Sequence, residues 1–278
     1  MIISGVLMMR YEFPFFLRLS PSRRWPLLTT LPVLSLFLLA LVAMPPLAAS
    51  QTASLTASQT VRPVDAGYES LANAAALPDL RQLPAGPQRK DAFLEVLVPI
   101  VEVENSLLAA RGEWLRALAQ RDTPWTTVER KRVAALCEDY ALECAPGEVS
   151  DLLLKRVAPV PLEMVAVQAV EESGWGTSRL ARQNNNLFGM RASSGRYQSF
   201  DSVQDAVRAY LKNLNTHGAY AELRARRAQL AAQGNVPPEA LITMLNDYAT
   251  RADYPDVLLS LLRTNAERIR RHAGDTPA

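Results

Sequence analysis

The stretch EESGWGTSRLARQNNNLFGM, residues 171–190, combines residue types that few folding requirements alone would bring together. Two adjacent carboxylates precede a Gly-Trp-Gly turn, and an asparagine run then closes on Leu-Phe-Gly. A carboxylic acid that stays protonated near neutral pH can protonate a glycosidic oxygen as a general acid. Asparagine amides can hydrogen-bond sugar hydroxyls and acetamido groups. The residue types are therefore compatible with acid catalysis at a glycosidic bond.

The position of each carboxylate on its helix distinguishes the two. The segment PLEMVAVQAVEES, residues 161–173, predicts a helix that is apolar nearly all round and therefore buried. Gln168 and Glu172 lie four residues apart and share one face. At the end of this helix, partial desolvation, aided by Trp175, and the negative end of the helix dipole both raise the pKa of Glu172. Glu171 points about 100° away, so we expect it at the surface or behind the site. The alternative is that Glu172 is an ordinary solvated residue.

The string EESGWGTSRLARQNNNLFGMR resembles the signature of the exported glucosaminidases of glycoside hydrolase family 73, especially the Bax-type branch. The likeness continues through YQSFDSVQDAVRAYLKNLNTHGAYAELRARRAQL and resumes in YATRADYPDVLLSLLRTN, so it covers most of residues 90–270. The resemblance implies a lysozyme-like fold and a substrate of peptidoglycan or related chains that contain N-acetylglucosamine.

The resemblance also assigns site residues. Glu172 matches the family's general acid, whereas Glu171 has no counterpart. Residues expected to contact substrate are Gln168, Trp175, Asn185, Asn186, Phe188 and Tyr248. Each of the last five has a structural alternative: core packing for the tryptophan, an Asx-type loop around a buried phenylalanine, and a hydrogen-bonded core tyrosine.

One departure from the family concerns the second acid of the two-carboxylate scheme. Family members often carry a β-hairpin lobe with an acidic residue after the NNLFG motif, but no carboxylate lies between Met190 and Asp201 here. Asp201 and Asp247 are candidates, although Asp201 also fits a helix cap. A substrate-assisted route would need only Glu172. The predicted function is therefore an exported peptidoglycan hydrolase, an endo-β-N-acetylglucosaminidase. A lytic transglycosylase and a non-catalytic peptidoglycan-binding or scaffold protein are the alternatives.

Composition limits the other functional classes. The net charge of +2 and an aromatic content of 7% give no electrostatic signature of nucleic-acid binding. The two histidines, His217 and His272, lie far apart in sequence, so we expect no metal site, and no motif asks for a cofactor. The expected partner is the peptidoglycan glycan strand.

The chain divides into three predicted segments. Within residues 1–49, Arg23 and Arg24 precede an apolar run and a small-residue exit, which is typical of a signal peptide, or of a membrane anchor if it is not cleaved. We therefore expect the protein in the periplasm or cell envelope, attached to the membrane if this segment is retained. Residues 50–89 are rich in Ser, Thr, Ala and Pro and predict a flexible linker. Residues 90–278 predict a mainly α domain with minimal or no β-lobe, whose catalytic core spans about 148–272.

Two local features remain open. Pro99 interrupts a long helical pattern and is expected to kink or divide the helix. Cys137 and Cys144 either form a disulfide or are two small buried residues. A continuous helix between them would hold them too far apart to bond, so a disulfide requires a break in the helix.

Overall fold

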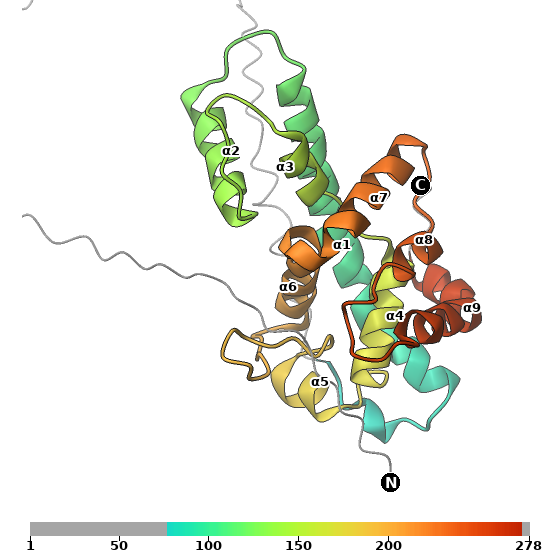
Figure 1. Ribbon diagram of the computed structural model, residues 1–278. Helices are drawn as coiled ribbons and strands as arrows, with labels where there is room; N and C mark the ends of the chain where they lie inside the picture. The colour runs from blue at the N-terminus through green and yellow to red at the C-terminus, as the bar shows by residue number, and fades with distance from the viewer. Residues whose placement is uncertain (1–76, 274–278) are drawn as a thin grey trace, which may run out of the picture. The chain divides into compact units, whose positions relative to one another are not determined.

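The computed structural model describes residues 77–273, and it confirms the mainly helical fold. The signal-peptide or anchor prediction and the linker prediction up to residue 76 lie outside the described residues. No helix within 77–273 is long and apolar enough to cross a membrane. In chain order the helices are η1 (Leu80–Gln82), α1 (Pro87–Ala119), α2 (Thr127–Asp139), α3 (Asp151–Arg156), α4 (Leu162–Ser173), α5 (Arg179–Asn184), α6 (Val203–Thr216), η2 (Gly218–Tyr220), α7 (Ala221–Ala232), α8 (Pro238–Ile242) and α9 (Tyr254–His272) (Figure 1).

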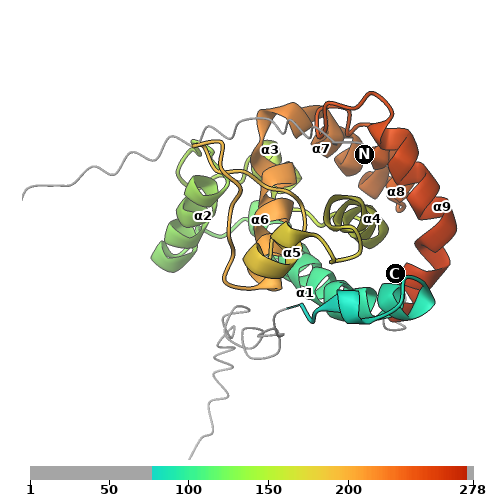
Figure 2. The same cartoon turned by 90° about the horizontal axis from the view of Figure 1, so that it is seen from below.

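Helix α4 lies at the centre of the domain. In Figure 2 it is seen nearly end-on with other helices around it, and it contacts α1, α8 and α9. Every residue from Met164 to Val170 is buried, as the apolar pattern of this segment predicts. The helix that carries Glu172 is therefore held from several sides.

The β-lobe is reduced to a turn. Within residues 77–273 there is no strand, and a single antiparallel bridge joins Arg191 to Tyr197. The segment RYQSF, the one short strand candidate in the sequence, contributes only this bridge. The connection between α5 and α6 is thus a loop.

Helix α1 continues through Pro99, so of the two expected outcomes, a kink or a division, the division is wrong. A proline ring removes one backbone hydrogen bond and crowds the preceding turn. Here the residues around it, including Val98 and Ile100, are buried in the core. Tertiary packing along this face holds the helix together despite the local loss.

The domain begins before the predicted boundary at residue 90. Leu77 and Leu80, inside the segment assigned as linker, are 9% and 1% exposed and belong to the hydrophobic core. Helix α1 itself begins at Pro87. Residues 77–89 are therefore part of the folded domain, which corrects that part of the linker prediction.

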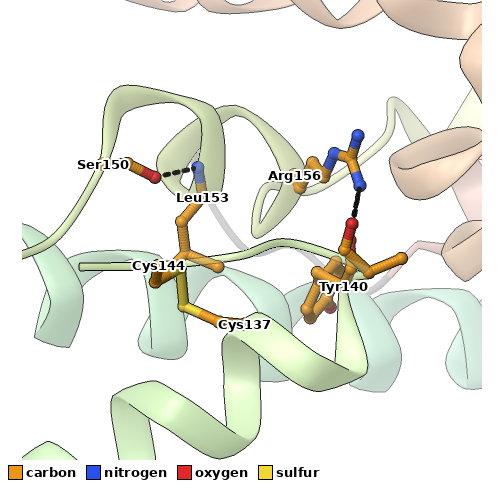
Figure 3. Close-up of a disulfide and its surroundings, with 7 residues drawn as sticks. Cys137, Tyr140, Cys144, Ser150, Leu153 and Arg156 are labelled. Carbon is orange, nitrogen blue, oxygen red and sulfur yellow. Dashed lines mark hydrogen bonds between the residues drawn. A yellow bond between two sulfur atoms is a disulfide. The ribbon is translucent and has the colours of Figure 1, made fainter. Parts of the chain in front are cut away.

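Cys137 and Cys144 form a disulfide (Figure 3). Helix α2 ends at Asp139, and Ala141 then adopts a left-handed conformation with φ of 53°. This break turns the chain back, so the two Cα atoms lie 6.1 Å apart, within the range that a disulfide can bridge. Arg156 of α3 donates a hydrogen bond to the carbonyl of Tyr140 and holds the same turn.

A cavity of about 360 Å³ lies between α1 and α6, and Glu172 does not line it. Its charged side chains neutralise one another: Glu104 pairs with Arg208 at 2.8 Å, and Lys212 pairs with Asp139 at 3.1 Å. The chemistry expected from the sequence therefore has to be sought outside this cavity, at the end of α4 that carries Glu172.

Candidate active site

The turn after α4 has an unusual backbone. Gly174, Trp175 and Gly176 are all left-handed, with φ of 58°, 56° and 73°. A Cβ at Gly176 would lie 2.5 Å from a methyl group of Leu77, so glycine is needed there for space as well as conformation. Ser173 accepts a 2.8 Å hydrogen bond from the Gly176 amide and ties the turn to the helix end. A left-handed tryptophan is strained, and such strain gathers at functional sites.

Glu172 occupies the last turn of α4 and is largely buried. Its Oε1 accepts a hydrogen bond of 2.8 Å from the Tyr254 hydroxyl. Burial raises the pKa of Glu172 from 4.5 to about 7. The Tyr254 hydrogen bond opposes this rise in pKa, the charge of Glu171 adds to it, and the charge of Arg251 opposes it. The carboxyl group is thus protonated for a substantial fraction of the time near neutral pH, as a general acid requires.

Glu171 has a different environment. It forms an ion pair of 3.1 Å with Arg251, which also pairs with Asp253 at 3.0 Å. This exposed pairing is typical of a surface carboxylate, so the two adjacent glutamates differ as the helix phase predicts.

Gln168 lies behind Glu172 and is 0% exposed. Its Oε1 accepts a hydrogen bond from the Tyr210 hydroxyl, and its Nε2 donates to the Tyr254 hydroxyl at 3.3 Å. With no exposed surface in this conformation, Gln168 has no direct route to a ligand. In this structure its partners are the two tyrosines, and the contact with substrate stays a prediction.

Phe188 and Tyr248 are also buried rather than facing solvent. The Phe188 ring stacks on Tyr210 at 4.0 Å, and Tyr248 stacks on Tyr254 at 5.6 Å between ring centroids. The Tyr248 hydroxyl donates a 3.0 Å hydrogen bond to the Phe188 carbonyl. Both predicted contact residues are therefore parts of an aromatic cluster that supports the site from behind.

Asn186 holds the loop after α5 together. Its side chain donates to the carbonyls of Met190 and Gln198, at 2.8 and 3.0 Å, and accepts from the Met190 amide at 2.9 Å. It is 1% exposed, so in this structure its side chain shapes the loop, and its contact with substrate stays a prediction. Asn185 ends α5 in the left-handed conformation, and its amide bonds the Phe200 carbonyl at 3.0 Å while part of its side chain stays exposed.

Trp175 is half-buried in the turn that follows α4. Its ring meets Phe93 edge-on at 5.9 Å, and the Lys90 ammonium lies 4.9 Å from the ring centroid. Among the six residues expected to bind substrate, Trp175 and Asn185 therefore keep surface that a ligand can reach.

Tyr254 contacts Glu172 but is not among the site residues predicted from the sequence. It is the second tyrosine of YATRADY, and only the first, Tyr248, is predicted as a site residue. The spacing of the two tyrosines is the signal that could have found it, since both hydroxyls are buried at the same cluster. Of the two, Tyr254 is the one that touches Glu172.

The two candidates for a second acid, Asp201 and Asp247, are both exposed. Ser202, rather than Asp201, caps α6, because its hydroxyl accepts from the Asp205 amide at 3.0 Å. Burial raises the pKa of Tyr220 well above its usual value, and the charges of Asp247 and Glu172 add to the rise. Tyr220 thus interacts electrostatically with both Asp247 and Glu172.

The comparisons with known proteins cover this whole region. A glucosaminidase family model, described as mannosyl-glycoprotein endo-beta-N-acetylglucosaminidase, matches residues 153–267. Protein bax of Escherichia coli strain K12 is 38% identical over 216 residues, which is 72% of this chain and 78% of that protein. No solved structure matches the chain. Gln168, Glu172 and Tyr254 all fall in the part that the family model covers. The chain belongs to the glucosaminidase family.

Proposed function

We propose that the protein is a peptidoglycan hydrolase, an endo-β-N-acetylglucosaminidase that cleaves glycan strands with Glu172 as its general acid. The observation that carries the proposal is the burial of Glu172 at the end of α4, which raises its pKa to about 7. Membership of the glucosaminidase family supports a glycan as the substrate.

In the proposed reaction, the protonated Glu172 carboxyl donates its proton to the glycosidic oxygen as the bond to the sugar's anomeric carbon breaks. The Tyr254 hydroxyl, which bonds Oε1, then stabilises the carboxylate that forms. Trp175 offers an apolar surface in the turn that follows α4, and Asn185 offers a polar one. The acetamido oxygen of the substrate can attack the anomeric carbon as the glycosidic bond breaks, and a water molecule that gives its proton to the Glu172 carboxylate then opens this intermediate. This route needs no second carboxylate, and the α5–α6 loop has none before Asp201.

The test is digestion of purified sacculi by the wild-type protein and by Glu172→Gln, followed by mass spectrometry of the products. Loss of a general acid lowers the rate by roughly 10² to 10⁴, so Glu172→Gln should be nearly inactive while it still binds sacculi. The matched control is Glu171→Gln, which changes the adjacent carboxylate and should keep most of its activity. Wild-type turnover by Glu172→Gln would refute the assignment.

The products also separate the alternatives. Fragments with reducing-end N-acetylglucosamine support the glucosaminidase. Anhydro-muramic ends would identify a lytic transglycosylase, which also works with one glutamate. Binding without any product would indicate a non-catalytic module.

The cellular location is part of the proposal. The apolar run and small-residue exit within residues 1–49 favour export to the periplasm or cell envelope. Fractionation of cells, with N-terminal sequencing of the mature chain, tests this. A full-length product confined to the cytoplasm would contradict it.

A further inference from the structure

Four buried or largely buried side chains form a continuous hydrogen-bond chain that ends on the proposed acid. The Tyr210 hydroxyl donates to Oε1 of Gln168, Nε2 of Gln168 donates to the Tyr254 hydroxyl at 3.3 Å, and that hydroxyl donates to Glu172 at 2.8 Å. They come from three helices far apart in sequence, α4, α6 and α9. Packing alone does not explain the buried amide of Gln168, because a buried polar group is destabilising unless all its hydrogen bonds are made.

The chain has a direction that follows from the amide. The oxygen of a glutamine side chain only accepts hydrogen bonds, and its nitrogen only donates. With Oε1 of Gln168 facing the Tyr210 hydroxyl, Nε2 necessarily faces Tyr254. In this arrangement Tyr210 is the donor at one end of the amide, and its proton gives the chain its direction toward Glu172.

The same logic fixes the hydroxyl of Tyr254. A phenol has one proton to donate and lone pairs that accept. Because Nε2 of Gln168 donates to the Tyr254 oxygen, the phenol's own proton is left for Oε1 of Glu172. A reversed amide would offer Tyr254 an acceptor that competes with Glu172 for that proton.

The two oxygens of Glu172 are consequently different. Oε1 already receives a proton in a hydrogen bond from Tyr254, whereas Oε2 has no hydrogen-bond partner among residues 77–273. A proton on Oε1 would oppose the Tyr254 hydrogen, so the protonated acid carries its proton on Oε2.

We propose that Gln168 and Tyr210 are positioning residues that orient the Tyr254 hydroxyl toward Oε1 of Glu172 and so keep the transferable proton on Oε2. The consequence for catalysis rests on the proposed function, in which Glu172 is the general acid. Gln168 and Tyr210 act through Tyr254, so neither needs to touch the substrate.

The experiment is a double-mutant cycle on the titration of Glu172 in the full-length protein. The titration is read by carbon-13 NMR of the glutamate carboxyl carbons and, independently, by the basic limb of the pH–activity profile. Tyr254→Phe removes the hydrogen bond that stabilises the carboxylate, so the pKa of Glu172 should rise by about one unit. Gln168→Met, of similar volume but without an amide, should raise the pKa in the same direction by less.

The cycle then separates positioning from packing. If Gln168 acts through Tyr254, the shift caused by Gln168→Met should vanish in the Tyr254→Phe background. An equal shift in both backgrounds, or none in either, overturns the proposal. Should Gln168→Met fail to fold, Tyr210→Phe carries the test, because it removes the donor to Oε1 and keeps the ring. Its matched control is Tyr248→Phe, whose hydroxyl bonds the Phe188 carbonyl outside the chain and should leave the midpoint in place.

The two proposals fail in different ways. Wild-type protein that releases no product from sacculi would refute the proposed function, while the NMR titration would still be readable. If the wild-type protein is active but the pKa of Glu172 stays unchanged in the Gln168 and Tyr210 variants, only the positioning role is refuted.

Discussion

Glu172 is a residue whose acidity differs between the folded and the unfolded chain. Its pKa is about 7 when folded, against an ordinary value of 4.5. Between these values the folded protein binds more protons than the unfolded chain, so the free energy of unfolding falls as pH rises through this window and is flat above it. The ionised form of Glu172, which the reaction produces, therefore lowers the stability of the folded protein.

This gives a stability prediction for Glu172→Gln, whose side chain never ionises. At pH 8 the variant should be more stable than wild type by about 3 kcal/mol, as an upper figure. At pH 4, where the wild-type carboxyl is mostly protonated in both states, the difference should nearly disappear. Urea unfolding at the two pH values measures both.

Glu171→Gln is the control for this prediction. Its ion pair with Arg251 is exposed, so its loss should change the unfolding free energy by less than about 1 kcal/mol at either pH. A difference between Glu172→Gln and wild type that does not depend on pH would mean that the carboxyl is not protonated in the folded protein near neutrality.

The sequence could predict the place of Glu172 but not the roles of its neighbours. The helix phase and the apolar pattern around it are local, so the end of a buried helix could be read directly. Whether Gln168 or Phe188 faces a ligand or the core depends on Tyr210, Tyr248 and Tyr254, which lie on distant segments. A motif marks which residues matter at a site without distinguishing those that touch the ligand from those that support them.

At the scale of elements, the helices could be predicted from periodicity, whereas the start of the domain could not. The composition of residues 50–89 is that of a linker, and only its last part folds into the domain. Leu77 and Leu80 are two apolar residues in a proline-rich stretch, and a Cβ at Gly176 would meet both. This long-range contact leaves no periodic pattern in the sequence.

The packing of Leu80 in the hydrophobic core predicts that Leu80→Ala destabilises the domain. Leu80 is 1% exposed, and removing a fully buried leucine side chain lowers the unfolding free energy by about 2 to 5 kcal/mol. Thermal or urea unfolding measures the change, and Gln82→Ala, an exposed neighbour on η1, should shift it by about 0.5 kcal/mol or less. If Leu80→Ala unfolds like wild type, residues 77–89 are a linker after all, and a chain that starts at Lys90 should be equally stable.

The whole molecule differs from a two-carboxylate glycosidase in the segment that connects α5 to α6. This loop is closed by side-chain hydrogen bonds of Asn185 and Asn186 and carries one isolated bridge in place of a hairpin lobe. Because the loop is so short, it brings no carboxylate opposite Glu172 before Asp201. The departure from the family pattern that the sequence shows is thus a structural feature of the domain.

The short loop yields a prediction about Asp201 and Asp247. If the substrate's own acetamido group replaces the second acid, Asp201→Asn and Asp247→Asn should each keep activity on sacculi within about tenfold of wild type, far above the loss of roughly 10² or more expected for Glu172→Gln. Asp201→Asn is the matched control, because Asp201 is exposed beside the Ser202 cap, whereas Asp247 and Glu172 both act on Tyr220. The measurement is the initial rate of product release, with unfolding curves to show that both variants fold. A loss at Asp247→Asn as large as that at Glu172→Gln, with Asp201→Asn unaffected, would identify Asp247 as the second acid and exclude a mechanism with Glu172 alone.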